Sequence, residues 1–215
     1  MWRYLTLAAL SFFLIGLLLL YFKPWKKDLP VSETLLKNND LNQTFPGLVL
    51  FDIDDTLTTG NDNENVVQMV IDHGWAVGIC TANSSYTMDN IKNKSWMPKN
   101  LWDFIKKYND ITFNNVGSGF LLGKKQLGVY KRLYSETPPG IDVYGFRKGF
   151  ALEQTGKVLG INNPKCMVLC DDLKPFIEGV KKYNPELITI CSGSNCGGQL
   201  TVKNVEKVIQ ECSGV

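Results

Sequence analysis

The chain has 215 residues, of which 44% are hydrophobic and 20% charged, and this balance excludes a disordered or low-complexity protein. Its 23 basic and 21 acidic residues give a net charge of +2 without a basic stripe, so no nucleic-acid-binding signature is present. The length suits one folded domain with an additional segment, and composition identifies no protein partner.

The N-terminus carries the strongest hydrophobic signal. Residues 4–22 are uncharged and long enough to cross a bilayer as a helix, so we expect a transmembrane anchor with its flanks over residues 1–25. A cleaved signal peptide is the alternative, but Lys-Pro-Trp-Lys follows where small cleavage-site residues are expected. Three lysines follow the segment, against one arginine and the amino terminus before it, which favours a cytoplasmic main domain by one charge.

A polar stretch without clear periodicity follows the anchor, and we interpret residues 26–46 as a linker. The main domain is then expected over residues 47–215. Of the six cysteines, Cys80, Cys166 and Cys170 lie in or beside apolar runs, which favours reduced core thiols over disulfides. Sequons, which weakly favour a secretory lumen instead, begin at Asn42, Asn83 and Asn93.

Beyond residue 46, short apolar runs alternate with segments of helical periodicity. Strands are expected at 48–53, 75–81, 111–116, 165–171 and 186–193. Helices are expected at 63–74, 84–93, 99–109, 149–160, 175–184 and 201–212. This β-α-β order predicts an α/β fold with a doubly wound, mainly parallel, Rossmann-like sheet and helices on both of its faces.

The first expected strand ends in an unusual cluster of acidic residues. Four apolar residues typical of a strand buried on both faces run directly into Asp52, Asp54 and Asp55. Buried carboxylates are costly unless they are paired, hydrogen-bonded or bound to a metal. The cluster therefore predicts a site that contains positive charge.

Polar residues also follow other strands, and ligands of such sheets bind outside the carboxyl ends of the strands. Thr81 ends the second strand, and Asp171 and Asp172 end the fourth. Lys148, at the start of the preceding helix, is the expected cation, with Arg147 and Lys157 as nearby rivals.

Four segments of the chain, "LVLFDIDDT", "AVGICT", "FRKGFAL" and "VLCDD", resemble in order and spacing the motifs of the haloacid dehalogenase (HAD) superfamily of aspartate-nucleophile phosphohydrolases. The resemblance spans about residues 48–215. It departs from the family at Cys170, where many members have glycine, and in the adjacency of the two final acids.

The resemblance implies phosphoryl transfer, and its chemistry accounts for the residue types. Asp52 is the expected nucleophile, and Asp54 the acid that protonates the leaving group and the base that activates water. Thr81 is expected to bind a phosphoryl oxygen, and Lys148 to neutralise developing charge.

Clustered carboxylates favour a hard cation, and the resemblance implies Mg²⁺. The expected ligands are Asp52, the main-chain carbonyl of Asp54, and Asp171 or Asp172, a choice that stays open. We therefore predict a membrane-anchored, Mg²⁺-dependent phosphatase that cleaves phosphate monoesters. The alternatives are a catalytically silent scaffold at a membrane and carbon–halogen hydrolysis, which does not use the second aspartate of the first motif.

The spacing of the motifs limits any lid over the site. Residues 82–147 exceed what the sheet needs by enough for a small cap, but not for a second domain. This favours an open site and phosphorylated substrates larger than a simple sugar phosphate. The alternative is that residues 117–140 fold over the site.

Overall fold

The computed structural model describes residues 44–213 of the chain. The predicted anchor over residues 1–25 and nearly all of the linker over 26–46 lie outside this part. Within the described residues, the helices are too short or too polar to span a bilayer.

A seven-stranded sheet forms the centre of the domain, with strand order β5-β4-β3-β2-β1-β6-β7. Five strands are parallel, while β4 is antiparallel to both β3 and β5. The strands are β1 (Leu48–Phe51), β2 (Ala76–Thr81), β3 (Phe113–Asn115), β4 (Phe120–Leu121), β5 (Lys124–Lys125), β6 (Met167–Asp171) and β7 (Ile188–Cys191).

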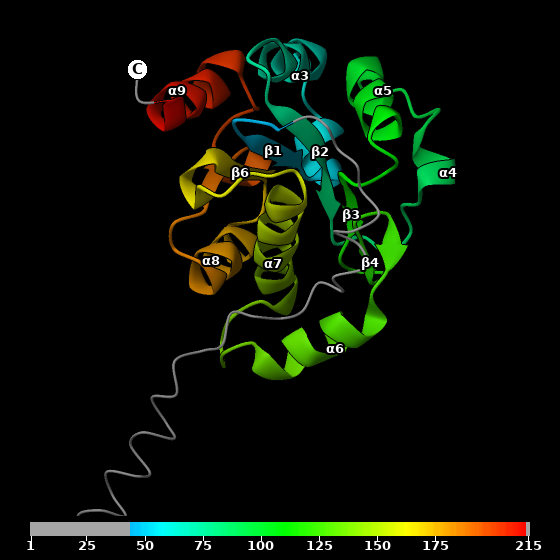
Figure 1. Cartoon of the computed structure of the whole chain (residues 1–215), viewed down its shortest axis with the longest axis vertical. Coiled ribbons are helices and arrows are strands. Elements are labelled where there is room, and N and C mark those ends of the chain that lie inside the picture. The colour runs from blue at the N-terminus through cyan, green and yellow to red at the C-terminus, as the bar shows by residue number, and fades with distance from the viewer. Residues whose placement is uncertain (1–43, 214–215) are drawn as a thin grey trace, which may run out of the picture. The chain divides into compact units, whose positions relative to one another are not determined.

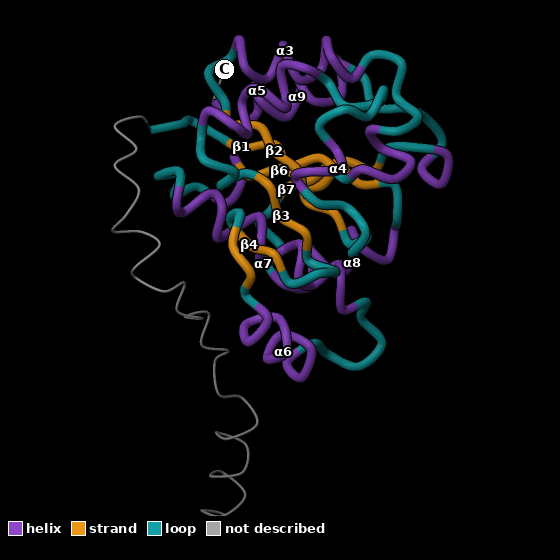
Figure 2. The backbone as a smooth tube through the Cα atoms, turned by 90° about the vertical axis from the view of Figure 1, so that its right-hand side faces the viewer, coloured by secondary structure: helices purple, strands orange, loops and turns teal. Residues whose placement is uncertain are grey.

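Helices cover both faces of the sheet, which gives three layers. Helices α3, α5 and α9 lie on one face, and α7 and α8 pack together on the other (Figures 1 and 2). The helices are α3 (Asn63–Asp72), α4 (Met88–Ile91), α5 (Lys99–Lys107), α6 (Leu127–Glu136), α7 (Val143–Val158), α8 (Lys174–Tyr183) and α9 (Val202–Ser213). The predicted mainly parallel α/β architecture is confirmed.

Strand β1 fixes the position of the acidic cluster. Its four residues are fully buried, as expected for a strand covered on both faces. Phe51 pairs with Ile79 of β2 on one side and with Cys170 of β6 on the other. The chain continues outward from β2 to β3 and from β6 to β7, so the topological switch point lies beside β1, where such sheets bind ligands.

The stretch without a sequence assignment, residues 117–140, extends the sheet at its β3 edge. It contains β4, β5 and α6, and α6 packs against α7. Arg147 of α7 donates to the carbonyl of Tyr130 at 3.0 Å and lies over the Tyr130 ring. The interactions of this stretch therefore tie it to the sheet edge and to α7.

The expectation of reduced cysteines is wrong for Cys166. This residue forms a disulfide with Cys212 of α9, and Cys191 forms a second one with Cys196. Cys80 and Cys170 are free and fully buried, as expected. Because the partner of Cys166 lies 46 residues away in sequence, the local apolar run gave no signal for this bond.

Candidate active site

Lys148 joins the ends of two strands. Its Nζ lies 2.7 Å from Oδ1 of Asp52, directly after β1, and 2.6 Å from Oδ2 of Asp171, the last residue of β6. The side chains of Lys148 and Asp171 have no exposed surface, and that of Asp52 is 7% exposed. A buried cation between two buried carboxylates satisfies charges that would otherwise be very costly.

The packing of α7 against α8 holds this lysine in the interior. A Cβ atom on Gly145 would lie 2.6 Å from the Cα of Phe176, and one on Gly179 would lie 2.7 Å from the Cα of Gly145. Only glycine permits this approach of the two helices. This approach places the centroid of the Phe176 ring 4.6 Å from Nζ of Lys148, and the ring helps to exclude water from the ion pairs.

The two rival cations lie elsewhere. Arg147, the neighbour of Lys148 on α7, contacts Tyr130 and Tyr144 instead of the acidic cluster. Lys157 is half exposed and pairs with Glu153 at 3.3 Å, one helical turn away. The structure thus brings Lys148 alone of the three to Asp52.

Burial and charge act in opposite directions on this cluster. Burial raises the pKa of Asp52 to about 7, although Lys148 acts to lower it, and the neighbouring Asp171 raises it further. Burial alone would lower the pKa of Lys148, but Asp52 and Asp171 outweigh that effect and raise it. Lys148 is therefore charged at neutral pH, and Asp52 is poised between its two protonation states.

Three carboxylates, those of Asp52, Asp171 and Asp172, each present an oxygen within 4.8 Å of the others, a grouping that can hold a metal ion. Lys148 supplies one positive charge to this group of three, so a divalent cation suits the remaining negative charge. An all-oxygen donor set is the kind that Mg²⁺ prefers. The residues present therefore fit the expected metal.

The two final acids differ in their remaining hydrogen-bonding capacity. Asp171 accepts from Lys148 with one oxygen and from the backbone N–H of Leu173 with the other, at 2.9 Å. Asp172 accepts the Asn195 amide at 2.9 Å with one oxygen, and within the described part no other residue donates to its carboxylate. Burial raises the pKa of Asp172, although the hydrogen bond from Asn195 acts to lower it, and the charges of Asp171 and Asp55 raise it further. Because fewer neighbouring residues donate to Asp172 than to Asp171, Asp172 is favoured as the acid that offers a ligand atom.

The Asp54 side chain lies outside the group of three carboxylates. Its two oxygens accept from the Tyr86 hydroxyl at 2.6 Å and from the Asn83 amide at 3.1 Å. The expected ligand from Asp54 is its main-chain carbonyl, which stays a prediction. The Asp54 carboxyl is thus separate from the three carboxyl groups that can hold a metal.

Thr81 lies where the sequence predicted, fully buried at the end of β2. Its hydroxyl oxygen accepts the backbone N–H of Asn83 at 3.2 Å, which fixes the turn after the strand. A hydroxyl that accepts one hydrogen bond can still donate another. Its expected contact with a phosphoryl oxygen stays a prediction.

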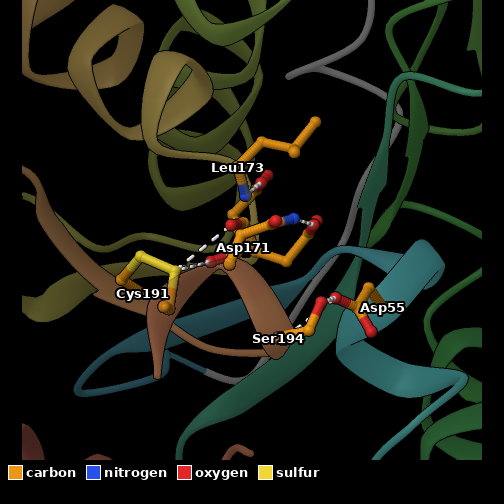
Figure 3. The surroundings of a disulfide bond; sticks show 8 residues. Asp55, Asp171, Leu173, Cys191 and Ser194 are labelled. Carbon is orange, nitrogen blue, oxygen red and sulfur yellow. Dashed lines mark hydrogen bonds between the residues drawn. A yellow bond between two sulfur atoms is a disulfide. The ribbon is translucent and has the colours of Figure 1, made fainter. Parts of the chain in front are cut away.

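The loop after β7 forms one wall of the site, and sequence reasoning missed it. Ser194 donates to the carboxylate of Asp55 from both its backbone N–H and its hydroxyl, and these bonds lower the pKa of Asp55 (Figure 3). Asp55 has a left-handed backbone with φ 53°, a conformation that side-chain hydrogen bonds help to fix. The loop therefore stabilises the turn that carries Asp54.

Close backbone approach and a disulfide shape this loop. Gly193 has φ 105°, and a Cβ there would lie 2.6 Å from the carbonyl oxygen of Asp55. The Cys191–Cys196 disulfide closes the loop at its base, beside Asp171 (Figure 3). A signal was present in the sequence, because the polar run Ser-Gly-Ser-Asn follows the strand end just as the predicted site residues follow theirs.

Compared with known proteins, the chain matches no family model, no curated protein and no solved structure. Its own architecture defines its class. It is an α/β domain with a mixed, mainly parallel seven-stranded sheet and a buried group of three aspartates at the ends of neighbouring strands.

Proposed function

We propose that the protein is a Mg²⁺-dependent phosphohydrolase that cleaves phosphate monoesters through a phosphorylated Asp52 and is held at a membrane by residues 4–22. The observation that carries this proposal is the Lys148 bridge between Asp52 and Asp171, with Asp172 beside it. A stable fold does not need three carboxylates and a lysine in its interior, whereas phosphoryl transfer needs a nucleophile surrounded by positive charge.

In the first step, an Asp52 oxygen attacks phosphorus while the bond to the leaving oxygen breaks. Asp54 gives its proton to that oxygen, so the products are an alcohol and an aspartyl phosphate. Lys148 offsets the charge that develops on the phosphoryl group, and the Thr81 hydroxyl donates to one of its oxygens. Held by Asp52 and Asp172, with the main-chain carbonyl of Asp54 as a further expected ligand, Mg²⁺ would supply further positive charge at the phosphoryl oxygens.

In the second step, Asp54 is ionised and accepts a proton from water. The water oxygen attacks phosphorus, the bond to Asp52 breaks, and inorganic phosphate leaves. Asp54 regains its proton and Asp52 its charge, which returns the site to its starting state. Asp54 is hydrogen-bonded to Asn83 and Tyr86 of the loop after β2, whereas Lys148 pairs with Asp52 and Asp171, and this difference in partners supports a separate role for Asp54.

The metal assignment makes a prediction about pH. An aspartate in the unfolded chain has a pKa near 3.8, whereas burial raises that of Asp52 to about 7. The metal-free folded protein thus keeps a proton on Asp52 that the unfolded chain has lost, so the contribution of Asp52 to stability falls as pH rises from about 4 to about 7. Because Mg²⁺ must displace that proton, its apparent affinity is expected to fall by up to about tenfold for each pH unit below about 7, the pKa of folded Asp52.

Thermal unfolding of the full chain in detergent, with Mg²⁺ or with a chelator, measures this effect. Mg²⁺ should raise the unfolding temperature clearly at about pH 8 and little at about pH 5. In the same samples, hydrolysis of a chromogenic phosphate ester should require Mg²⁺ and stop in the chelator. Full activity in the chelator, or an equal Mg²⁺ effect at both pH values, would contradict the assignment.

A further inference from the structure

We infer that Tyr86 and Asn83 are positioning residues for Asp54, holding its carboxyl group in the orientation for proton transfer. This inference rests on the proposed function and extends it to residues that the four motifs do not contain. Both residues lie in the loop after β2 and donate hydrogen bonds to the Asp54 carboxylate, the Tyr86 hydroxyl to Oδ1 and the Asn83 amide to Oδ2.

These two hydrogen bonds leave the Asp54 carboxylate little rotational freedom. Two donors on different oxygens fix both the position and the plane of the group, which one donor cannot do. Burial and the adjacent Asp54 raise the pKa of Tyr86 to about 12, so its hydroxyl keeps the proton that it donates. An edge-on contact with Trp96, with ring centroids 5.8 Å apart, holds the tyrosine ring.

The loop that carries both residues is itself fixed to the fold. Asn115, fully buried at the end of β3, donates its side-chain amide to the carbonyls of Asn83 and Tyr86, at 2.8 and 2.7 Å. Asn90 donates to the carbonyl between them, that of Ser85, at 2.7 Å. A chain of hydrogen bonds therefore runs from the central sheet to the carboxyl group that transfers the proton.

Such a network makes Asp54 a preorganised group instead of a freely rotating one. Asp54 follows a strand end in an exposed turn, where its side chain would otherwise sample several rotamers. A general acid gains most where the leaving group is a poor one that needs a proton. The loss of positioning should therefore appear on alkyl phosphates and be small on activated aryl esters.

Tyr86→Phe removes only the hydroxyl and keeps the ring against Trp96. We expect its kcat for an alkyl phosphate to fall about tenfold, with KM little changed, and its kcat for p-nitrophenyl phosphate to stay within about twofold of wild type. Asn83→Ala is a second variant with the same expected pattern. Tyr134→Phe, which removes the hydroxyl of a tyrosine that is 66% exposed on α6, is the matched control and should leave both rates unchanged.

A double-mutant cycle with Asp54→Asn separates positioning from general damage. If Tyr86 acts through Asp54, Tyr86→Phe has no further effect once Asp54 is replaced. Equal losses on both esters, an additive loss in the cycle, or an unchanged rate on the alkyl ester would overturn the inference. Wild-type protein without activity on either ester would instead overturn the proposed function, so the two failures can be told apart.

The cysteines support a second, independent inference: we propose that the described domain matures in an oxidising compartment. Each disulfide joins residues whose Cα atoms are 5.4 Å apart, within the usual range for such bonds. Three of the four bonded cysteines have exposed surface, whereas both free cysteines of the described part are fully buried in β2 and β6. Stable disulfides without an exposed free thiol are typical of proteins outside the reducing cytosol.

An oxidising compartment is opposite to the cytoplasmic location that the charges flanking residues 4–22 favour by a single charge. In each bond, two thiols lose two protons and two electrons to a disulfide-bearing oxidoreductase, whose own disulfide becomes two thiols. The cytosol opposes this reaction because it keeps thiols reduced. The second bond, Cys191–Cys196, closes the loop whose Ser194 and Asn195 contact Asp55 and Asp172, so oxidation also supports the site.

The test is to express the full chain, with its own N-terminal segment, in bacteria that have a reducing cytoplasm and an oxidising periplasm. Thiols are labelled with a polymer-linked maleimide during denaturing lysis, with and without prior reduction. We expect two labels before reduction, on Cys80 and Cys170, and six after it. A double variant, Cys191→Ser with Cys196→Ser, should still show two before reduction and four after it. Four or six labels on the wild-type chain before reduction would overturn the proposal.

Discussion

Replacement of Lys148 by methionine is expected to destabilise the domain by about 3–5 kcal/mol and to abolish phosphatase activity. Methionine fills much of the space of the lysine stem, but it leaves Asp52 and Asp171 buried without their shared cation. An unpaired buried charge is costly, whereas the lost packing is small. Urea unfolding, monitored at neutral pH in the presence of a chelator, measures the loss of stability without the contribution of bound metal.

Lys157→Met is the matched control, because it makes the same substitution on the same helix. The Lys157 side chain is 48% exposed, and its partner Glu153 keeps hydrogen bonds from Tyr183 and Asn184. Its loss should cost less than about 1 kcal/mol and leave activity intact. Similar unfolding midpoints for the two variants would show that the buried bridge is not the stabilising interaction described here.

Asp52→Asn is expected to reduce turnover roughly a thousandfold or more while the fold persists. An amide is a poor nucleophile, so the first step is lost. The amide is nearly the same size as the carboxylate and keeps an oxygen that can accept from Lys148. Because the substitution also removes one of three clustered negative charges, we expect the unfolding temperature to be unchanged or higher at neutral pH.

The control for this variant is Asp103→Asn, which neutralises an exposed aspartate of α5. Its side chain is 62% exposed and pairs loosely with Lys99 at 3.7 Å. Both the rate and the unfolding temperature should stay close to those of wild type. A folded Asp52→Asn variant with a wild-type rate would remove Asp52 from the mechanism.

The sequence predicts the parallel core well because each of its elements has a clear pattern. The run Leu48–Phe51 is wholly apolar, and its strand is buried on both faces. By contrast, β4 and β5 have only two residues each, too few for any periodicity to appear. Their pairing depends on the β3 edge that they extend, which is a tertiary effect.

Side chains that directly follow a strand were predictable, and those that reach the site from loops were not. Asp52, Thr81 and Asp171 are placed by strand ends whose register the sheet fixes. Tyr86 lies five positions beyond the end of its strand, and the side chain of Asn115 at the neighbouring strand sets its position. No local pattern encodes that hydrogen bond between residues 29 positions apart.

The sequence placed Lys148 near Asp52, and the structure explains why Lys148 reaches Asp52 and the adjacent Arg147 does not. Lys148 and Arg147 are adjacent on α7, so a change of one position directs the side chain either to Asp52 or to Tyr130. The motif order favoured Lys148, while helix geometry decides between the two. The contact of α8 at Gly145 is what sets that face toward the strand ends.

The most direct test of the central claim is to look for phosphate on Asp52 itself. The full chain is mixed with Mg²⁺ and a chromogenic phosphate ester, quenched in acid during turnover, and digested for mass spectrometry of the peptide that contains residues 48–60. The proposed mechanism predicts one phosphoryl group on Asp52 in wild type, and none in Asp52→Asn. The Asp54→Asn variant, in which hydrolysis of the phosphorylated Asp52 should be slow, is treated in the same way. Sustained hydrolysis by wild type, with no phosphate on Asp52 in either wild type or this variant, would contradict the mechanism.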